Sequence, residues 1–66
     1  MKHIDAELHS RLKPEVGYRF YGAIFNDKKL RFVDGCPIAT STVLEVIEEQ
    51  GNTFIKTKNS TYKIVS

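Results

Sequence analysis

Three side chains in this sequence of 66 residues are of types that bind transition metals: His3, His9 and Cys36. His3 and His9 are six residues apart, so on a helix they would lie on nearly opposite sides. The chain contains no Cys-x-x-Cys or His-x-x-x-His pair, which are the usual spacings of a zinc site. We therefore predict no metal site and no cofactor.

Nucleophilic catalysis requires an activated side chain, a base and a group that orients the base. Cys36 follows Asp34 and Gly35, a pattern equally typical of a small thiol in a turn. Ser41 lies in Thr-Ser-Thr and not in a Gly-x-Ser-x-Gly elbow. The four glycines are scattered and form no phosphate-binding loop. We therefore expect no catalytic residues, and a protein that is not an enzyme.

Aromatic and basic side chains alternate along the middle of the chain. One interpretation places the aromatic residues in the core and the lysines on exposed strand edges. The other is a small barrel that binds nucleic acid by stacking bases on aromatic rings beside basic groups. On either a protein-binding or a nucleic-acid-binding hypothesis, the candidate binding residues are Tyr18, Arg19, Tyr21, Phe25, Lys28, Lys29 and Arg31.

Charge and composition narrow the class of protein. Ten basic and eight acidic residues give a net charge of +2, too small for a dedicated DNA-binding protein and of the wrong sign for an acidic DNA mimic. A single cysteine excludes an internal disulfide, which favours the reducing cytoplasm. Met1 to Glu7 contains no apolar run, and no stretch reaches 18 apolar residues, so we expect neither a signal peptide nor a membrane span.

The elements that would position these residues begin with a predicted helix over 1–14. Ile4, Leu8 and Leu12 recur every four residues, and Pro14 ends the pattern. Residues 17–26 are rich in aromatic residues and predict a strand, in which Gly22 marks a bulge or a close backbone approach. Residues 30–33 predict a second strand.

The segment from Thr40 to Gln50 is ambiguous. Thr42 and Glu45 could form the capping box of a helix, whereas the β-branched residues and a Gly51-Asn52 turn favour a strand paired with the next segment. We favour the strand. Cys36-Pro37-Ile38 is expected to be a sheet edge or a loop, because proline donates no ladder hydrogen bond.

The C-terminal part predicts strands over 53–57 and 61–65 joined by a turn at 58–60, with Tyr62 and Ile64 pointing inward. The predicted fold class is therefore mainly β (α+β): a short N-terminal helix followed by about five short antiparallel strands, in a small SH3-like or OB-like barrel or rolled sheet. One domain spans 1–66, with 1–14 as a helical arm and 17–66 as the β domain. So short a chain has little core, so we expect a homodimer or a tight complex with a partner.

Residues from Phe32 to Ile64 carry a resemblance to known proteins. They include Gly35, Ile38, Thr40-Ser41 with Val43, and then Phe54, Thr57, Asn59-Ser60 and Tyr62 with Ile64. This half of the chain resembles small uncharacterised proteins of bacteria and their phages that end in a Thr-x-Asn-Ser-x-Tyr β-hairpin. The resemblance implies a compact β fold and a phage or mobile-element origin, and it implies no reaction.

These observations together predict a cytoplasmic, non-catalytic binding module. We expect a phage- or mobile-element-type accessory or regulatory protein that acts by protein–protein interaction through an aromatic patch around Tyr18, Tyr21 and Phe25. The alternative is a small β-barrel that binds nucleic acid through the same side chains.

Overall fold

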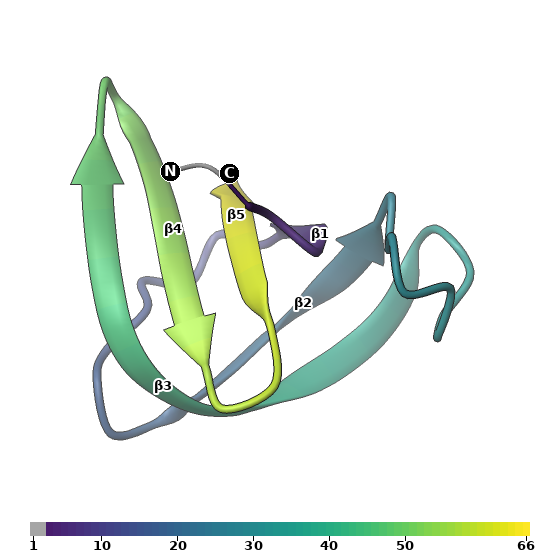
Figure 1. Ribbon diagram of the computed structural model, residues 1–66, viewed down its shortest axis with the longest axis horizontal. Helices are drawn as coiled ribbons and strands as arrows, with labels where there is room; N and C mark the ends of the chain where they lie inside the picture. The colour runs from purple at the N-terminus through teal and green to yellow at the C-terminus, as the bar shows by residue number, and fades with distance from the viewer. Residues whose placement is uncertain (1–2) are drawn as a thin grey trace.

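The computed structural model describes residues 3–66, which form a closed barrel of five β-strands (Figure 1). The strands are β1 (Ala6–His9), β2 (Arg19–Phe25), β3 (Cys36–Glu49), β4 (Asn52–Thr57) and β5 (Thr61–Val65). No helix occurs within residues 3–66. The prediction of a mainly β barrel is confirmed.

The strands pair in the order in which they occur in the chain. Each of β1 to β4 is antiparallel to the strand that follows it, and β1 and β5 close the barrel as a parallel pair. The expected all-antiparallel sheet is therefore wrong at this one junction. Consecutive pairing also distinguishes the barrel from the OB-fold, which is a Greek-key barrel.

The long strand β3 lets so few residues close into a barrel. Its first half pairs with β2 and its second half with β4. Figure 1 shows β3 as a strongly curved strand along the margin of the molecule. The register shifts by one residue opposite Phe20 and again near Leu44. Such bulges increase the local bend of a strand. At the first shift the buried Thr40 hydroxyl oxygen accepts a hydrogen bond from the Phe20 N–H at 3.0 Å.

The core contains inward-facing side chains from all five strands. The buried cluster consists of Ala6, Leu8, Phe20, Ile24, Val43, Ile55 and Tyr62. Ile64 packs against this cluster, so the inward orientation predicted for Tyr62 and Ile64 is confirmed. Tyr18, which precedes β2, is 67% exposed.

The predicted N-terminal helix is wrong, and Met1 and Lys2 of that range lie outside the described residues. Residues 6–9 instead form β1, in which the buried Ala6 and Leu8 alternate with more exposed neighbours. This strand gains ladder hydrogen bonds on both sides, which override a weak helical pattern. Gly22 provides the predicted close approach, because a Cβ there would stand 3.0 Å from the His9 carbonyl oxygen.

The predicted strand over 30–33 is also wrong, since these residues belong to the loop between β2 and β3. Cys36-Pro37-Ile38, expected as an edge or a loop, begins β3, with Pro37 opposite Ala23. The strand interpretation of the ambiguous segment is confirmed over Thr40–Glu49, and the predicted strands over 53–57 and 61–65 are confirmed as β4 and β5.

The hairpin between β3 and β4 turns one residue earlier than the sequence suggested. Glu49 pairs with Asn52, so the two turn residues are Gln50 and Gly51 instead of Gly51 and Asn52. Both have positive φ angles, 51° and 79°. A two-residue hairpin turn of type I′ requires positive φ at both positions, and there asparagine is favoured over glutamine.

Gln50→Asn is therefore expected to stabilise the protein. Asparagine tolerates the left-handed conformation better than glutamine, and we expect a gain of about 0.5–1 kcal/mol in the free energy of unfolding. Chemical denaturation of both proteins measures the difference. Asn52→Gln, outside the turn, is the matched control, and an unchanged or lower midpoint for Gln50→Asn would contradict the assigned turn.

Candidate functional site

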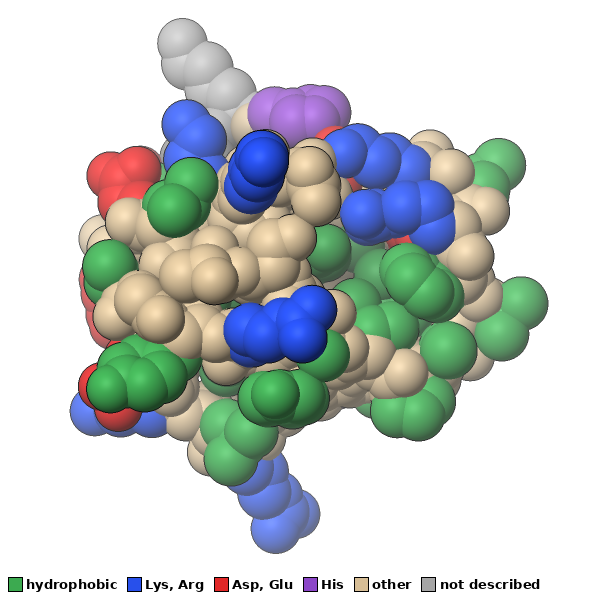
Figure 2. All heavy atoms as spheres, turned by 90° about the horizontal axis from the view of Figure 1, so that it is seen from below, with side chains coloured by type: hydrophobic (Ala, Val, Ile, Leu, Met, Phe, Trp, Pro, Cys, Tyr) green, Lys and Arg blue, Asp and Glu red, His purple; other side chains and the backbone are tan. Residues whose placement is uncertain are grey.

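The loop between β2 and β3, residues 26–35, carries the two most exposed large apolar side chains of the described residues, Leu30 and Val33. Leu30 is 88% exposed, Val33 78% and Phe32 41%. These three residues line a shallow depression together with polar residues of the same loop. Figure 2 shows hydrophobic side chains gathered on the right of the face it displays, the side on which this loop lies in Figure 1. We refer to Leu30, Phe32 and Val33 as the apolar tip.

The buried carboxylate of Asp27 fixes the conformation of this loop. It accepts hydrogen bonds from the backbone N–H groups of Lys29 at 3.1 Å and Arg31 at 2.9 Å. The Arg31 guanidinium also donates to both carboxylate oxygens, from Nε at 3.2 Å and from Nη2 at 3.1 Å. The Asp27 carbonyl oxygen accepts from the N–H of Leu30, which has a φ of 56°. These hydrogen bonds hold the backbone from Asp27 to Arg31, which carries Leu30 of the apolar tip, in one conformation.

The loop is also tied to the turn between β4 and β5. The Arg31 Nη1 and Lys29 Nζ groups donate to the hydroxyl oxygen of the buried Ser60 at 3.0 and 3.1 Å. Lys29 donates in addition to the Asn59 carbonyl oxygen. These contacts join segments about thirty residues apart, so the tip has a fixed position relative to the barrel.

A second buried carboxylate, Asp5, lies beside the same turn. It accepts a hydrogen bond from the Thr61 N–H at 2.9 Å and bonds the His3 ring at 2.9 Å, while the Lys29 Nζ group stands 4.0 Å away. The Asp5 backbone carbonyl oxygen accepts from the Lys28 N–H. Asp5 therefore connects the start of β1 both to β5 and to the loop that carries the apolar tip.

Both carboxylates are held in the charged form. Burial on its own would raise the pKa of Asp27, but hydrogen bonds from the side chain and backbone of Arg31 outweigh it and lower the pKa below 3.8. Burial would likewise raise the pKa of Asp5, and the Thr61 N–H, His3 and Lys29 together lower it below 3.8. Donation to Asp27 raises the pKa of the Arg31 guanidinium.

The seven binding residues predicted from the sequence do not form one patch of free side chains. Lys29 and Arg31 are engaged in the network around Asp27 and Ser60, and the Arg19 Nε group donates to the Thr40 carbonyl oxygen at 2.9 Å. The Phe25 ring packs at 4.2 Å, centroid to centroid, against the His9 ring. The remaining three, Tyr18, Tyr21 and Lys28, are exposed at separate positions before, within and after β2.

Sequence reasoning missed the apolar tip and the carboxylate that supports it. Leu30 and Phe32 alternate in the way that a strand predicts, and that periodicity concealed an anchored loop. The available signal was Asp27 followed by basic residues two and four positions later. An aspartate at such a position commonly accepts hydrogen bonds from backbone N–H groups of its own turn.

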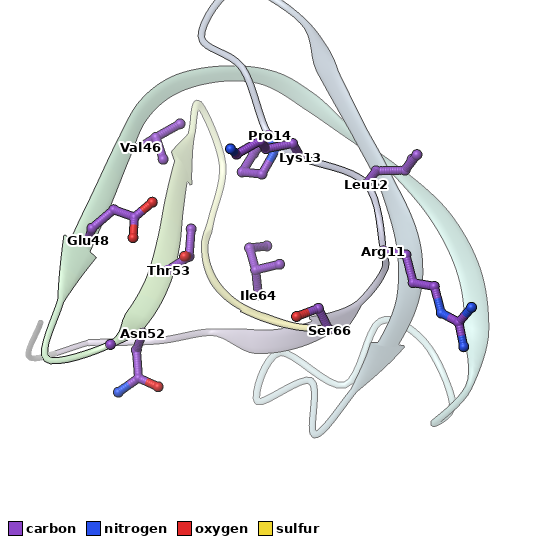
Figure 3. A pocket seen from close by; sticks show the side chains of 11 residues that line it. Arg11, Leu12, Lys13, Pro14, Val46, Glu48, Asn52, Thr53, Ile64 and Ser66 are labelled. Carbon is purple, nitrogen blue, oxygen red and sulfur yellow. The ribbon is translucent and has the colours of Figure 1, made fainter.

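A second hollow lies at one end of the barrel. It has a volume of about 360 Å³, and its lining includes the 11–14 segment, the second half of β3 and parts of β4 and β5. Figure 3 shows Val46, Glu48 and Ile64 directed into this space, whereas Arg11, Leu12 and Asn52 point away from it. The hollow is therefore lined by apolar side chains and by charged side chains of both signs, among them Glu48 and Lys13.

Within residues 3–66, no group of three or more His, Cys, Asp or Glu side chains could hold a metal ion. Cys36 is a free, half-buried thiol whose Sγ lies 3.8 Å from the Pro37 carbonyl oxygen. Over the same residues, no helix is long and apolar enough to cross a membrane.

Comparisons with protein-family models, with curated proteins and with solved structures found no match to this chain. The similarity to small bacterial and phage proteins therefore rests on the sequence pattern alone. The geometry of the loop and of the barrel end must support any functional argument.

Because of the two buried carboxylates, the free energy of unfolding depends on pH. Their pKa values are lower in the folded chain than in the unfolded chain, so the unfolded state binds more protons. The two carboxylates contribute fully to the free energy of unfolding at pH values above their unfolded-state pKa, near 3.8. This contribution is lost as the pH falls through their lower pKa values in the folded chain. We expect the free energy of unfolding to drop steeply below about pH 4.

Asp27→Asn tests this assignment. We expect a loss of about 1–3 kcal/mol at neutral pH, because Arg31 and two backbone N–H groups lose a charged acceptor, and a shallower decline of stability below pH 4. Thermal unfolding across this pH range measures both effects. Asp34→Asn, in the same loop, should retain the steep decline; an equally steep decline in Asp27→Asn would contradict the role given to Asp27.

Proposed function

We propose that the protein is a non-catalytic binding module that docks onto a protein partner through the apolar tip of its β2–β3 loop. One observation carries this proposal: three large apolar side chains, Leu30, Phe32 and Val33, are exposed on a loop fixed by hydrogen bonds to the buried Asp27 carboxylate. Exposed apolar patches on small soluble domains typically mark interaction surfaces.

The rigidity of the loop supports binding in particular. A flexible loop loses conformational entropy when it docks, whereas a loop held by Asp27, Arg31 and Ser60 has already lost it on folding. Aliphatic and aromatic groups in a fixed arrangement can enter a pocket of the partner and provide most of the binding energy. Lys28, exposed beside the tip, is suited to steering an acidic partner toward the rim.

The nucleic-acid alternative has less support. Two of the predicted phosphate-binding groups, Lys29 and Arg31, already donate to Asn59, Ser60 and Asp27. In Figure 2, blue Lys and Arg groups adjoin at the upper right, but the others stand apart, and no continuous stripe crosses the displayed face. A groove that follows a nucleic-acid backbone needs such a stripe.

The finer parts of the proposal rest on the sequence. They are an accessory or regulatory role of the phage or mobile-element type, a cytoplasmic location, and a homodimer as one form of the complex. The free thiol of Cys36 supports a reducing compartment.

The double variant Leu30→Asp/Val33→Asp tests the proposed surface. Both side chains are exposed, so the fold should persist, and we expect at least about a tenfold loss of affinity for any protein that the unaltered chain retains from an extract of its own source. Leu12→Asp replaces an exposed aliphatic side chain outside the loop and is the control.

Two results would contradict the proposed function. One is equal retention of the same proteins by the loop variant and by the control. The other is retention of nucleic acid that is released steeply as salt rises, which is the signature of phosphate contacts.

A further inference from the structure

β3 changes partners halfway along its length, so each half is paired on one side only, and the second half has an open edge on the side away from β4. The ladder with β2 ends at Arg19 and Thr42, and Val43 then exchanges backbone hydrogen bonds with Gly17 and Tyr18. Beyond Val43, the described residues place no backbone partner on this edge. Figure 1 shows the second half of β3 at the margin of the molecule, with β4 on one side only.

The open edge presents regularly spaced backbone groups. Glu49 and Asn52 flank a two-residue turn, and in such hairpins the flanking residues are hydrogen-bonded to each other. Because N–H and C=O directions alternate along a strand, those of Val46 and Glu48 point away from β4. Unpaired groups of this kind are a template for one more strand.

The hollow at the end of the barrel lies next to this edge. Val46 and Glu48 both line it, and Pro14 borders it from the opposite side. An extended segment that pairs with β3 would direct alternate side chains into this space of about 360 Å³. Strand addition typically combines such backbone pairing with pockets for alternate side chains.

The charge of the strand selects among occupants. Glu45 and Glu48 are exposed along the second half of β3. If a second copy paired antiparallel through the same edge, these carboxylates would be brought toward one another, and like charges on adjacent strands are destabilising. A basic segment gains from the same carboxylates. Along β3 itself, Glu45 and Glu48 therefore oppose self-pairing and favour a different chain that carries Lys or Arg, while Arg11 and Lys13 also line the hollow.

We propose that the open edge of β3 over 44–48 binds an extended, basic segment of a protein partner, which adds a strand to the sheet and places side chains in the adjacent hollow. This site is independent of the apolar tip and goes beyond the proposed function. The exposed Val16, Tyr18 and Leu44 stand where the edge begins, so an apolar side chain of the segment has contacts there.

The test uses the full chain and a synthetic capped peptide of alternating lysine and valine, about seven residues long. Amide hydrogen exchange is measured with and without the peptide, and affinity is measured by fluorescence anisotropy. We expect new protection at the Val46 and Glu48 amides. We also expect a glutamate–valine peptide of the same length to bind at least about tenfold more weakly, because its charges are repelled.

Matched variants and a modified peptide separate charge from backbone pairing. Glu45→Gln/Glu48→Gln should weaken binding by about two- to tenfold, the range of two partly exposed ion pairs, whereas Glu7→Gln on β1 should leave binding unchanged. Methylation of alternate peptide nitrogens removes donors and should abolish binding if the peptide adds as a strand.

The proposal is overturned if the methylated peptide binds as well as the unmodified one, or if Val46 and Glu48 gain no protection. It is also overturned if the free chain dimerises with protection at these same amides, because a second copy would then be the occupant. Leu30→Asp/Val33→Asp should bind the peptide normally, so failure at the β3 edge and failure at the apolar tip are distinguishable.

Discussion

The barrel depends on the ability of β3 to pair with different neighbours along its two halves. A flat strand of this length would leave β2 and β4 in one open sheet with an exposed apolar face. The bulges opposite Phe20 and near Leu44 bend the strand so that this face turns inward. Thr40 makes the first bend tolerable, because its side chain supplies the acceptor that the interrupted ladder removes from the Phe20 N–H. The core, the hollow and the open edge all follow from this bend.

Buried carboxylates complement a small apolar core. The central cluster contains seven side chains, which is little for a chain that has no disulfide. Asp5 and Asp27 lie between the N-terminal segment, the β2–β3 loop and the β4–β5 turn. There they accept hydrogen bonds from backbone N–H groups, including those of Thr61 and Arg31. A charged acceptor that is shared by several donors favours one arrangement of these three segments. Apolar contacts between segments this short would be less specific.

The sequence was informative where apolar and polar residues alternate within a strand and turn-forming residues mark its ends. β4, β5 and the aromatic strand β2 were recognised because apolar residues alternate and Gly or Asn residues punctuate them. The N-terminal strand was misread because Ile4, Leu8 and Leu12 also fit a helix, and only pairing with β2 and β5 decides against it. At the candidate site, the residue types did not indicate which side chains are free of internal partners. Lys29 and Arg31 also donate to Ser60, about thirty residues away in the chain, and no local pattern reveals that contact.

The parallel junction between β1 and β5 sets a condition on how the chain reaches its native state. Ala6 aligns with Tyr62, so this ladder joins segments that are 56 residues apart in the chain (62 − 6). Loop-closure entropy makes such a contact late and slow to form, and the high contact order of the barrel places it among slowly folding topologies. During synthesis the hairpins of β3, β4 and β5 can assemble only as each emerges, and β1 must wait unpaired on one side until Val65 has left the ribosome. Truncation within the last strand should therefore abolish cooperative folding altogether, because it removes the segment that completes the ring.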